Sequence, residues 1–176
     1  IKTALWTTDA PRPEFRQVIA TAPCYDHIFC AGTEAMDILS AEGRLNTVWL
    51  PFACDPELHR PVELRDEDQS LFPEDIVFVG AYYPNRWQIL KEIVGKYNIA
   101  IYGPGWQVVI DNRNRHAIHA GPVPPSTWVK MYSAARIILI IHYQDGVTPC
   151  FQASPKIFEA MSCRGFVITD VQKDVQ

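Results

Sequence analysis

The sequence feature that most constrains the fold is the segment Arg136–His142, whose inner residues are all Ile or Leu. A continuous apolar run of this length is typical of a strand covered on both faces, as strands of parallel sheets usually are. The following segment, Ser154–Asp170, predicts a helix and then a second buried strand. Pro155 suits the first turn of a helix, and Gly165 is the residue expected to take a left-handed conformation at its end. Together the two segments predict a β-α-β unit with parallel strands.

The same alternation of short apolar runs and helical patterns extends through the rest of the chain. We expect strands at 3–6, 26–31, 46–50, 76–79, 99–102, 117–120, 136–142 and 166–168. We expect helices at 14–22, 33–42, 85–94, 125–135 and 155–164. Strands that alternate with helices in this order predict an α/β fold with Rossmann-like parallel sheets.

Residues 56–73 differ in composition from the rest of the chain. They are rich in Pro, Glu, Asp and Arg and show no periodic pattern, so we interpret them as a linker between two domains, 1–55 and 74–176. The linker contains Asp66-Glu67-Asp68, and an Asp-x-Asp pair is one way to hold a divalent metal ion. A charge run without a flanking buried strand is more often a solvated surface, so we expect no metal site here.

Net charge, cysteine content and hydropathy limit the partners and the cellular setting expected for the chain. The net charge of −4 argues against nucleic acid bound by bulk electrostatics. The five cysteines are scattered and odd in number, with neither CxxC nor zinc-ligand spacing, which favours a reducing, cytoplasmic setting. No signal peptide is visible, and the longest apolar run, Ile137–Ile141, is far shorter than the ~20 residues of a membrane span.

Six stretches of the chain carry a resemblance to a known family. They are LWTTDAP (5–11), WLPFACDPELHRP (49–61), DIVFVGAYYPNR (75–86), IYGPGW (101–106), AGPVPPSTWVKMYSAARIILIIH (120–142) and SPKIFEAMSCRGFVITD (154–170). In this order they resemble group 1 glycosyltransferases of the GT-B fold, and most closely the CgeB-like (spore-maturation protein B-like) branch. The resemblance implies an incomplete acceptor-side domain at 1–55 and most of the nucleotide-sugar (donor) domain at 74–176.

The function implied by the resemblance is sugar transfer. A hexosyltransferase of this kind moves a sugar from a UDP- or GDP-sugar to an acceptor, here an unknown glycan, protein or small molecule, without a metal or other cofactor. The alternative is a non-catalytic module of the same fold that binds a nucleotide or carbohydrate. Whether these 176 residues suffice for transfer is left open.

The donor site is expected around the helix at 155–164. The resemblance places Glu159 on the ribose hydroxyls, with Lys156 where the family usually has arginine. From the residues themselves, Gly80 follows a strand and permits close backbone approach, while Arg86 lies in the first turn of the next helix, where a diphosphate is favoured. The alternative interpretation makes Glu159 a solvated helix residue, Gly80 a turn glycine and Arg86 a surface charge.

Further candidates lie in neighbouring loops. Gly103 and Gly105 follow the next strand and form a second expected wall of the pocket, and the resemblance places Val123 beside the nucleotide base. Asp9 and His142 end strands and are the candidate catalytic residues. Asp9 could instead cap the helix that follows it, and His142 could be structural.

Two positions depart from the family pattern. Phe151 stands where retaining group 1 enzymes carry a second glutamate, and Ile140 stands where many members have asparagine. Both departures favour the non-catalytic alternative, and they leave retention or inversion of the sugar configuration open. The aromatic residues Tyr82, Tyr83 and Trp106 could stack on a base or sugar, or pack the edge of the domain.

Overall fold

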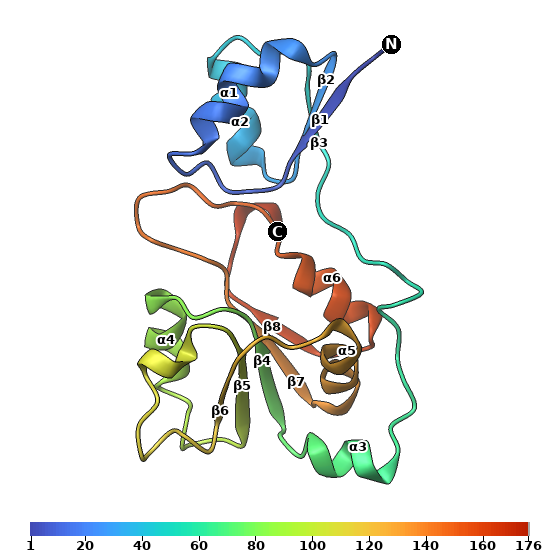
Figure 1. The fold of residues 1–176 in the computed structure, drawn as a ribbon, viewed down its shortest axis with the longest axis vertical. Coiled ribbons are helices and arrows are strands. Elements are labelled where there is room, and N and C mark those ends of the chain that lie inside the picture. Colours follow the sequence, from blue (N-terminus) through green and yellow to red (C-terminus); the bar gives the residue numbers. More distant parts are fainter. Residues whose placement is uncertain (176) are drawn as a thin grey trace. The chain divides into compact units, whose positions relative to one another are not determined.

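The structure is a computed structural model that describes residues 1–175 (Figure 1). It divides into two compact units. The first unit comprises Ile1–Phe52, Gln144–Ser154 and 171–175, and the second comprises Ala53–Tyr143 and Pro155–Asp170. This division differs from the predicted one in two ways. The expected linker belongs to the second unit, and two late segments of the chain belong to the first.

Strands and helices alternate along both units. The first unit contains β1 (Ala4–Thr7), α1 (Phe15–Thr21), η1 (Ala22–Cys24), β2 (His27–Cys30), α2 (Thr33–Ala41), β3 (Thr47–Trp49) and η3 (Lys173–Val175). The second contains α3 (Asp66–Leu71), β4 (Ile76–Val79), α4 (Pro84–Leu90), β5 (Ile99–Gly103), η2 (Trp106–Val108), β6 (Ile118–Ala120), α5 (Pro125–Ala134), β7 (Ile137–Ile140), α6 (Pro155–Ser162) and β8 (Val167–Thr169). Every predicted strand and helix is present, with ends displaced by a few residues, and α3 was not predicted.

The first unit is built on a parallel sheet of order β1-β2-β3. Helices α1 and α2 pack on one of its faces, where Phe15 and Leu39 meet Ile28 in the core. The alternation of side chains along a strand places Trp6 and Val48 on the other face, and both are exposed.

The two late segments of the first unit, Gln144–Ser154 and 171–175, contact the rest of that unit at the start of α2. The Asp174 carboxylate accepts hydrogen bonds from the Thr33 backbone N–H (2.8 Å) and hydroxyl (2.6 Å). The Asp174 N–H donates to the Phe151 carbonyl at 3.0 Å, and the Lys173 ammonium lies 4.7 Å from the centre of the Phe151 ring. Burial raises the pKa of the adjacent Glu34 carboxyl, and backbone N–H groups, including that of Phe151, oppose the shift. These contacts lie far apart in sequence, which is why no local pattern indicated them.

The second unit is a five-stranded parallel sheet of order β6-β5-β4-β7-β8. Helix α4 lies on one side of this sheet, and α5 and α6 lie on the other (Figure 1). Phe78, Leu90, Ile101 and Trp106 are central to a core cluster of this unit. The predicted α/β class with Rossmann-like parallel sheets is therefore confirmed.

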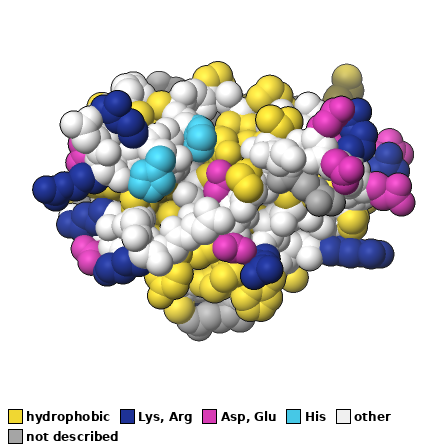
Figure 2. Space-filling view, turned by 90° about the horizontal axis from the view of Figure 1, so that it is seen from below, with side chains coloured by type: hydrophobic (Ala, Val, Ile, Leu, Met, Phe, Trp, Pro, Cys, Tyr) yellow, Lys and Arg dark blue, Asp and Glu magenta, His cyan; other side chains and the backbone are white. Residues whose placement is uncertain are grey.

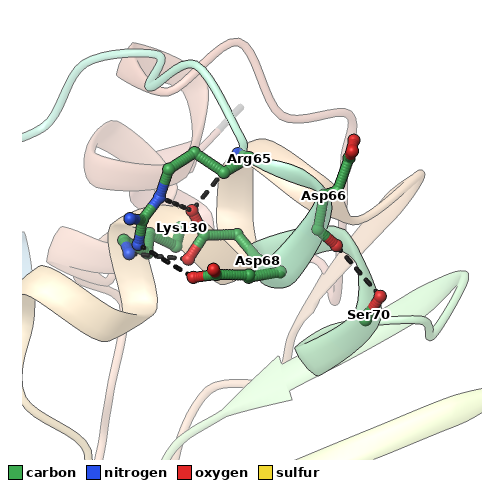
Figure 3. Close-up of polar contacts among 6 residues, drawn as sticks. Arg65, Asp66, Asp68, Ser70 and Lys130 are labelled. Atoms are coloured by element: carbon green, nitrogen blue, oxygen red, sulfur yellow. Dashed lines mark hydrogen bonds and ion pairs between the residues drawn. The ribbon is translucent and has the colours of Figure 1, made fainter.

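Helix α3 corrects the interpretation of Asp66-Glu67-Asp68 as a solvated run. Asp68 is only 4% exposed, and its carboxylate lies 2.7 Å from the Lys130 ammonium of α5 and 3.4 Å from Nε of Arg65 (Figure 3). Lys130 is the main cause that holds the pKa of Asp68 below its usual range. The ion pair of Asp68 and Lys130 holds α3 against α5. Because Lys130 lies far from Asp68 in the sequence, the local pattern around Asp68 could not predict its burial.

The end of α6 corrects a second prediction. The left-handed residue is Arg164, with φ of 62°, and not Gly165. The Gly165 N–H bonds the Ala160 carbonyl at 2.9 Å, which is the long hydrogen bond of a Schellman cap. Gly165 has a different requirement, because a Cβ there would overlap the Ile138 side chain of β7.

Candidate functional site

A pocket of about 300 Å³ opens at the carboxyl edge of the sheet in the second unit. In parallel α/β sheets this edge is the usual place for ligands. The pocket is lined by Val79, Gly80, Ala81, Gly103, Pro104, Pro122, Val123, Trp128, Tyr132, Lys156 and Glu159. The lining residues come from the ends of β4 and β5, from the loop after β6, and from α5 and α6. The edge thus gathers five of the predicted donor-site residues in one place.

Two glycines form the base of the pocket. Gly103 has φ of 140°, and a Cβ there would collide with the carbonyl oxygen of Gly80. The same oxygen accepts a hydrogen bond of 2.8 Å from the buried indole N–H of Trp106, which places Trp106 in the core and not in a ligand stack. Gly105 is also left-handed and lies against Tyr82, but it does not line the pocket. The glycines therefore let two backbone turns approach more closely than side chains would allow.

One wall carries opposite charges on a single helix. Lys156 and Glu159 lie three residues apart on α6, so they share a face of that helix, and both are partly buried. Burial lowers the pKa of Lys156; the Glu159 carboxylate opposes this shift, and the Arg86 guanidinium adds to it. Lys156 also lies in the first turn of α6, where backbone N–H groups favour anions. This wall can receive a ligand that has both hydroxyl donors and negative charge.

The opposite wall was not predicted. Trp128 and Tyr132 lie four residues apart on α5, and both line the pocket beside Pro122 and Val123. The indole nitrogen of Trp128 is buried without a hydrogen-bond partner among the described residues. Their i, i+4 spacing on a helix that follows a strand end was the only signal in the sequence. An aromatic and apolar wall of this kind suits the flat face of a base or sugar.

Arg86 does not line the pocket. Its Nε donates to the Ile141 carbonyl at 2.8 Å and its Nη1 donates to the Ala81 carbonyl at 2.9 Å. The guanidinium also lies 4.9 Å from the centre of the Tyr83 ring. Helix α4 begins at Pro84, and Arg86 of its first turn borders Gly80, where an added Cβ would lie 3.3 Å from Nη1 of Arg86. Arg86 therefore ties the ends of β4 and β7 together, and its predicted contact with a diphosphate stays a prediction.

The two candidate catalytic residues lie outside the pocket lining. His142 follows β7 with a side chain that is 3% exposed, and its Nδ1 lies 2.7 Å from Oδ1 of Asp170. Asp9 is exposed in the bend after β1, in the first unit. The alternative that Asp9 caps the next helix is wrong, because the N-cap of α1 is Glu14.

Residues 1–175, the part of the chain that the structure describes, contain neither a clustered metal site nor a membrane-spanning helix. Within this part of the chain no group of three or more His, Cys, Asp or Glu side chains is placed to hold a metal ion. None of the helices described there is both long and apolar enough to cross a bilayer. On the face drawn in Figure 2, Lys and Arg side chains lie among Asp and Glu, with hydrophobic side chains between them.

Comparison with known proteins gives one positive result. A family model described as glycosyl transferase-like matches residues 86–176, just over half of the chain. The matched part contains α5 and α6 and so includes Trp128, Tyr132, Lys156 and Glu159. No curated protein matches the chain.

Proposed function

Since the chain belongs to the glycosyltransferase-like family, we propose that it takes a nucleotide-sugar as donor and binds the nucleotide in the pocket of the second unit. The observation that carries this proposal is the convergence of Glu159 and Lys156 with the glycine turns after β4 and β5 around one cavity of about 300 Å³. Pockets of this size at a strand edge commonly hold small ligands.

Each part of the donor has a chemical counterpart in the pocket. The Glu159 carboxylate accepts hydrogen bonds from two ribose hydroxyls, and charge-assisted bonds of this type are the stronger ones. The diphosphate lies at the start of α6, beside Lys156. Burial lowers the pKa of Lys156, and an anionic ligand would favour its charged form. The base lies between the loop at Val123 and the Trp128 ring.

In this proposal catalysis is electrostatic. As the bond to the sugar breaks, negative charge grows on the leaving diphosphate, and Lys156 with the backbone N–H groups of α6 stabilises it. We propose that no metal is required. The Asp68 carboxylate supports this, because Lys130 and Arg65 already engage it. Membership of the CgeB-like branch and a cytoplasmic setting stay part of the proposal; the five cysteines, all free thiols, support the latter.

A non-catalytic nucleotide-binding module is the second candidate. Its supporting observation is Phe151, which stands where retaining relatives are expected to have a second glutamate. The Phe151 ring packs beneath the Lys173 ammonium, and its carbonyl accepts the Asp174 N–H. That position therefore serves packing in the first unit. Binding of nucleotide-sugar without turnover against a broad acceptor panel would favour this candidate.

The first prediction tests the donor site at Glu159. Glu159→Gln keeps the shape and removes the charge, so binding of UDP or GDP, measured by calorimetry, should weaken about tenfold, as expected for loss of about 1.4 kcal/mol. The melting temperature should barely change, because Glu159 lies beyond the first turn of α6, where the helix dipole contributes little to stability. Glu92→Gln is the matched control, since Glu92 is 67% exposed and outside the pocket.

A nucleotide analogue sharpens the same test. The 2′-deoxy form of the nucleotide should bind the parent protein about tenfold more weakly and lose little more against Glu159→Gln, because the two changes remove the same contact. Equal affinity of the parent and Glu159→Gln for every nucleotide would show that this carboxylate is a solvated helix residue, and the donor-site assignment would then be wrong.

A further inference from the structure

We propose that Tyr132 is a second ribose-binding residue. In this inference its hydroxyl donates a hydrogen bond to a ribose hydroxyl whose own proton is accepted by the Glu159 carboxylate. The inference rests on the proposed function, because it presumes a nucleotide whose ribose lies at Glu159. It deepens that function by adding a specificity-determining residue on α5, which selects ribonucleotides over deoxyribonucleotides.

Tyr132 and Glu159 line the same pocket from two different helices. Tyr132 belongs to α5 and Glu159 to α6, and both helices lie on the same side of the sheet in the second unit (Figure 1). The backbone N–H of Cys163 donates to the Glu159 carbonyl at 3.2 Å, so the side chains of these two residues lie one turn apart on one face of α6. The negative charge of either group raises the pKa of Tyr132, which indicates that the phenol oxygen lies near this face.

The Tyr132 hydroxyl and the Glu159 carboxylate have no hydrogen-bond partner among the residues that the structure describes, and they are not bonded to each other. Tyr132 is only 2% exposed, and a buried polar group is costly while it lacks a hydrogen bond. A ligand hydroxyl between the two groups accepts a hydrogen bond from the phenol and donates one to the carboxylate. Such a ligand therefore satisfies both groups at once.

The protonation of the phenol suits this role. Burial is the main cause that raises the pKa of Tyr132, and Glu159 and Cys163 add to the shift. The ordinary tyrosine pKa is already about 10, so near neutral pH the phenol keeps its proton and can donate it in a hydrogen bond. A deoxynucleotide has only a carbon-bound hydrogen at the corresponding position and would leave both protein groups unpaired. Sites built to bind a substrate hydroxyl reject analogues that lack it for this reason.

The residue one turn earlier on α5 also presents an unpaired donor. Trp128 lines the pocket, and its buried indole nitrogen has no hydrogen-bond partner within the described part of the chain. Four residues separate it from Tyr132, so both side chains lie on the same face of the helix. This face is therefore aromatic in shape and still able to donate hydrogen bonds, which suits a polar ligand better than an apolar one.

The test removes the hydroxyl alone. Tyr132→Phe keeps the ring, and UDP and GDP are titrated by calorimetry into the whole chain. The variant should bind the nucleotide that the parent prefers about fivefold more weakly. Without ligand it should melt at the temperature of the parent or above it, because the lost hydroxyl has no protein partner. Tyr97→Phe is the matched control and should leave the affinity unchanged, since Tyr97 is 62% exposed and outside the pocket.

Deoxynucleotides supply a readout that a purely structural role would not change. The 2′-deoxy and 3′-deoxy forms of the same nucleotide are titrated into the parent and Tyr132→Phe. For the analogue that lacks the hydroxyl bound by Tyr132, the two proteins should have equal affinity, because the variant and the analogue remove the same hydrogen bond. For the other analogue, the fivefold difference should persist.

The outcomes separate this inference from the proposed function. Equal nucleotide affinity of the parent and Tyr132→Phe overturns the inference, and so does a loss of the same size for the nucleotide and for both deoxy analogues. In either case the nucleotide site at Glu159 stands, because Glu159→Gln tests it separately. If no nucleotide binds the parent, the proposed function fails, and the role of Tyr132 fails with it.

Discussion

At the scale of single residues, the C-terminus of α6 contains a strained position. Arg164 has a left-handed backbone with φ of 62°. This conformation costs a residue with a Cβ about 1–2 kcal/mol. The hydrogen bond from the Gly165 N–H to Ala160 holds the cap closed in spite of that cost.

Replacing Arg164 by glycine should therefore stabilise the protein. We expect Arg164→Gly to raise the free energy of unfolding by about 0.5–1 kcal/mol, after subtraction of the larger backbone entropy of glycine in the unfolded chain. Thermal or chemical denaturation measures this gain.

The neighbouring position supplies the contrast. Gly165→Ala should lower stability, because its Cβ overlaps Ile138 and lies 3.0 Å from the Ala160 carbonyl oxygen. A destabilising Arg164→Gly would contradict the backbone strain assigned to Arg164, and a neutral Gly165→Ala would contradict the close packing assigned to Gly165.

At the scale of secondary-structure elements, α3 is held to α5 by the pair of Asp68 and Lys130. Because hydrogen bonding to Lys130 lowers the pKa of Asp68 in the folded state, the unfolded chain binds a proton more readily. The pair therefore stabilises the fold fully above the ordinary aspartate pKa of about 3.9 and loses its effect as the pH falls through the lower folded value.

The pH dependence of melting measures this contribution. Asp68→Asn should melt below the parent at about pH 7, and the difference should shrink as the pH falls below about 3.9 and through the lower pKa of folded Asp68. Asp66→Asn is the control, because Asp66 is an exposed residue of the same helix. A difference between parent and Asp68→Asn that is constant across this range would mean that the carboxylate charge contributes nothing.

The same scale shows which elements could be predicted from sequence. The strands follow from local apolar runs such as Ile137–Ile141, because a buried parallel strand needs little else. Helix α3 could not be predicted, since its burial depends on Lys130, which lies in a different element. The cap of α6 was misplaced by one residue, because Gly165 is fixed by close packing on β7 and the left-handed turn falls to Arg164.

The pocket residues also divide into those that the sequence predicts and those that only the fold reveals. Lys156 and Glu159 were predicted through the family resemblance, and Gly80 and Gly103 through their place after strands; all four line one cavity. Trp128 and Tyr132 were missed, because an aromatic pair on a helix also suits a core. Only the sheet order, which sets α5 beside the ends of β4 and β5, reveals the wall they form.

At the scale of the whole molecule, a metal-independent donor site has a direct test. Binding of UDP or GDP to the complete chain should be the same, within twofold or about 0.4 kcal/mol, with and without EDTA. The physical reason is that Lys156 and the start of α6 supply the positive charge that a bound metal would otherwise bring to the diphosphate. Calorimetry in metal-depleted buffer makes the comparison. Affinity that disappears on chelation and returns with Mn²⁺ would contradict the prediction.

The chain passes between its two units after residues 52, 143, 154 and 170. Exchange of the second unit, the proposed donor unit, between relatives therefore cannot be made by splicing at a single point. A chimera needs four junctions, and the segment Gln144–Ser154 must come from the same parent as Thr33 and Asp174, whose contacts it shares. The same contacts predict that substitutions in these distant stretches are coupled, so a change in one of them should be tolerated best together with a matching change in the others.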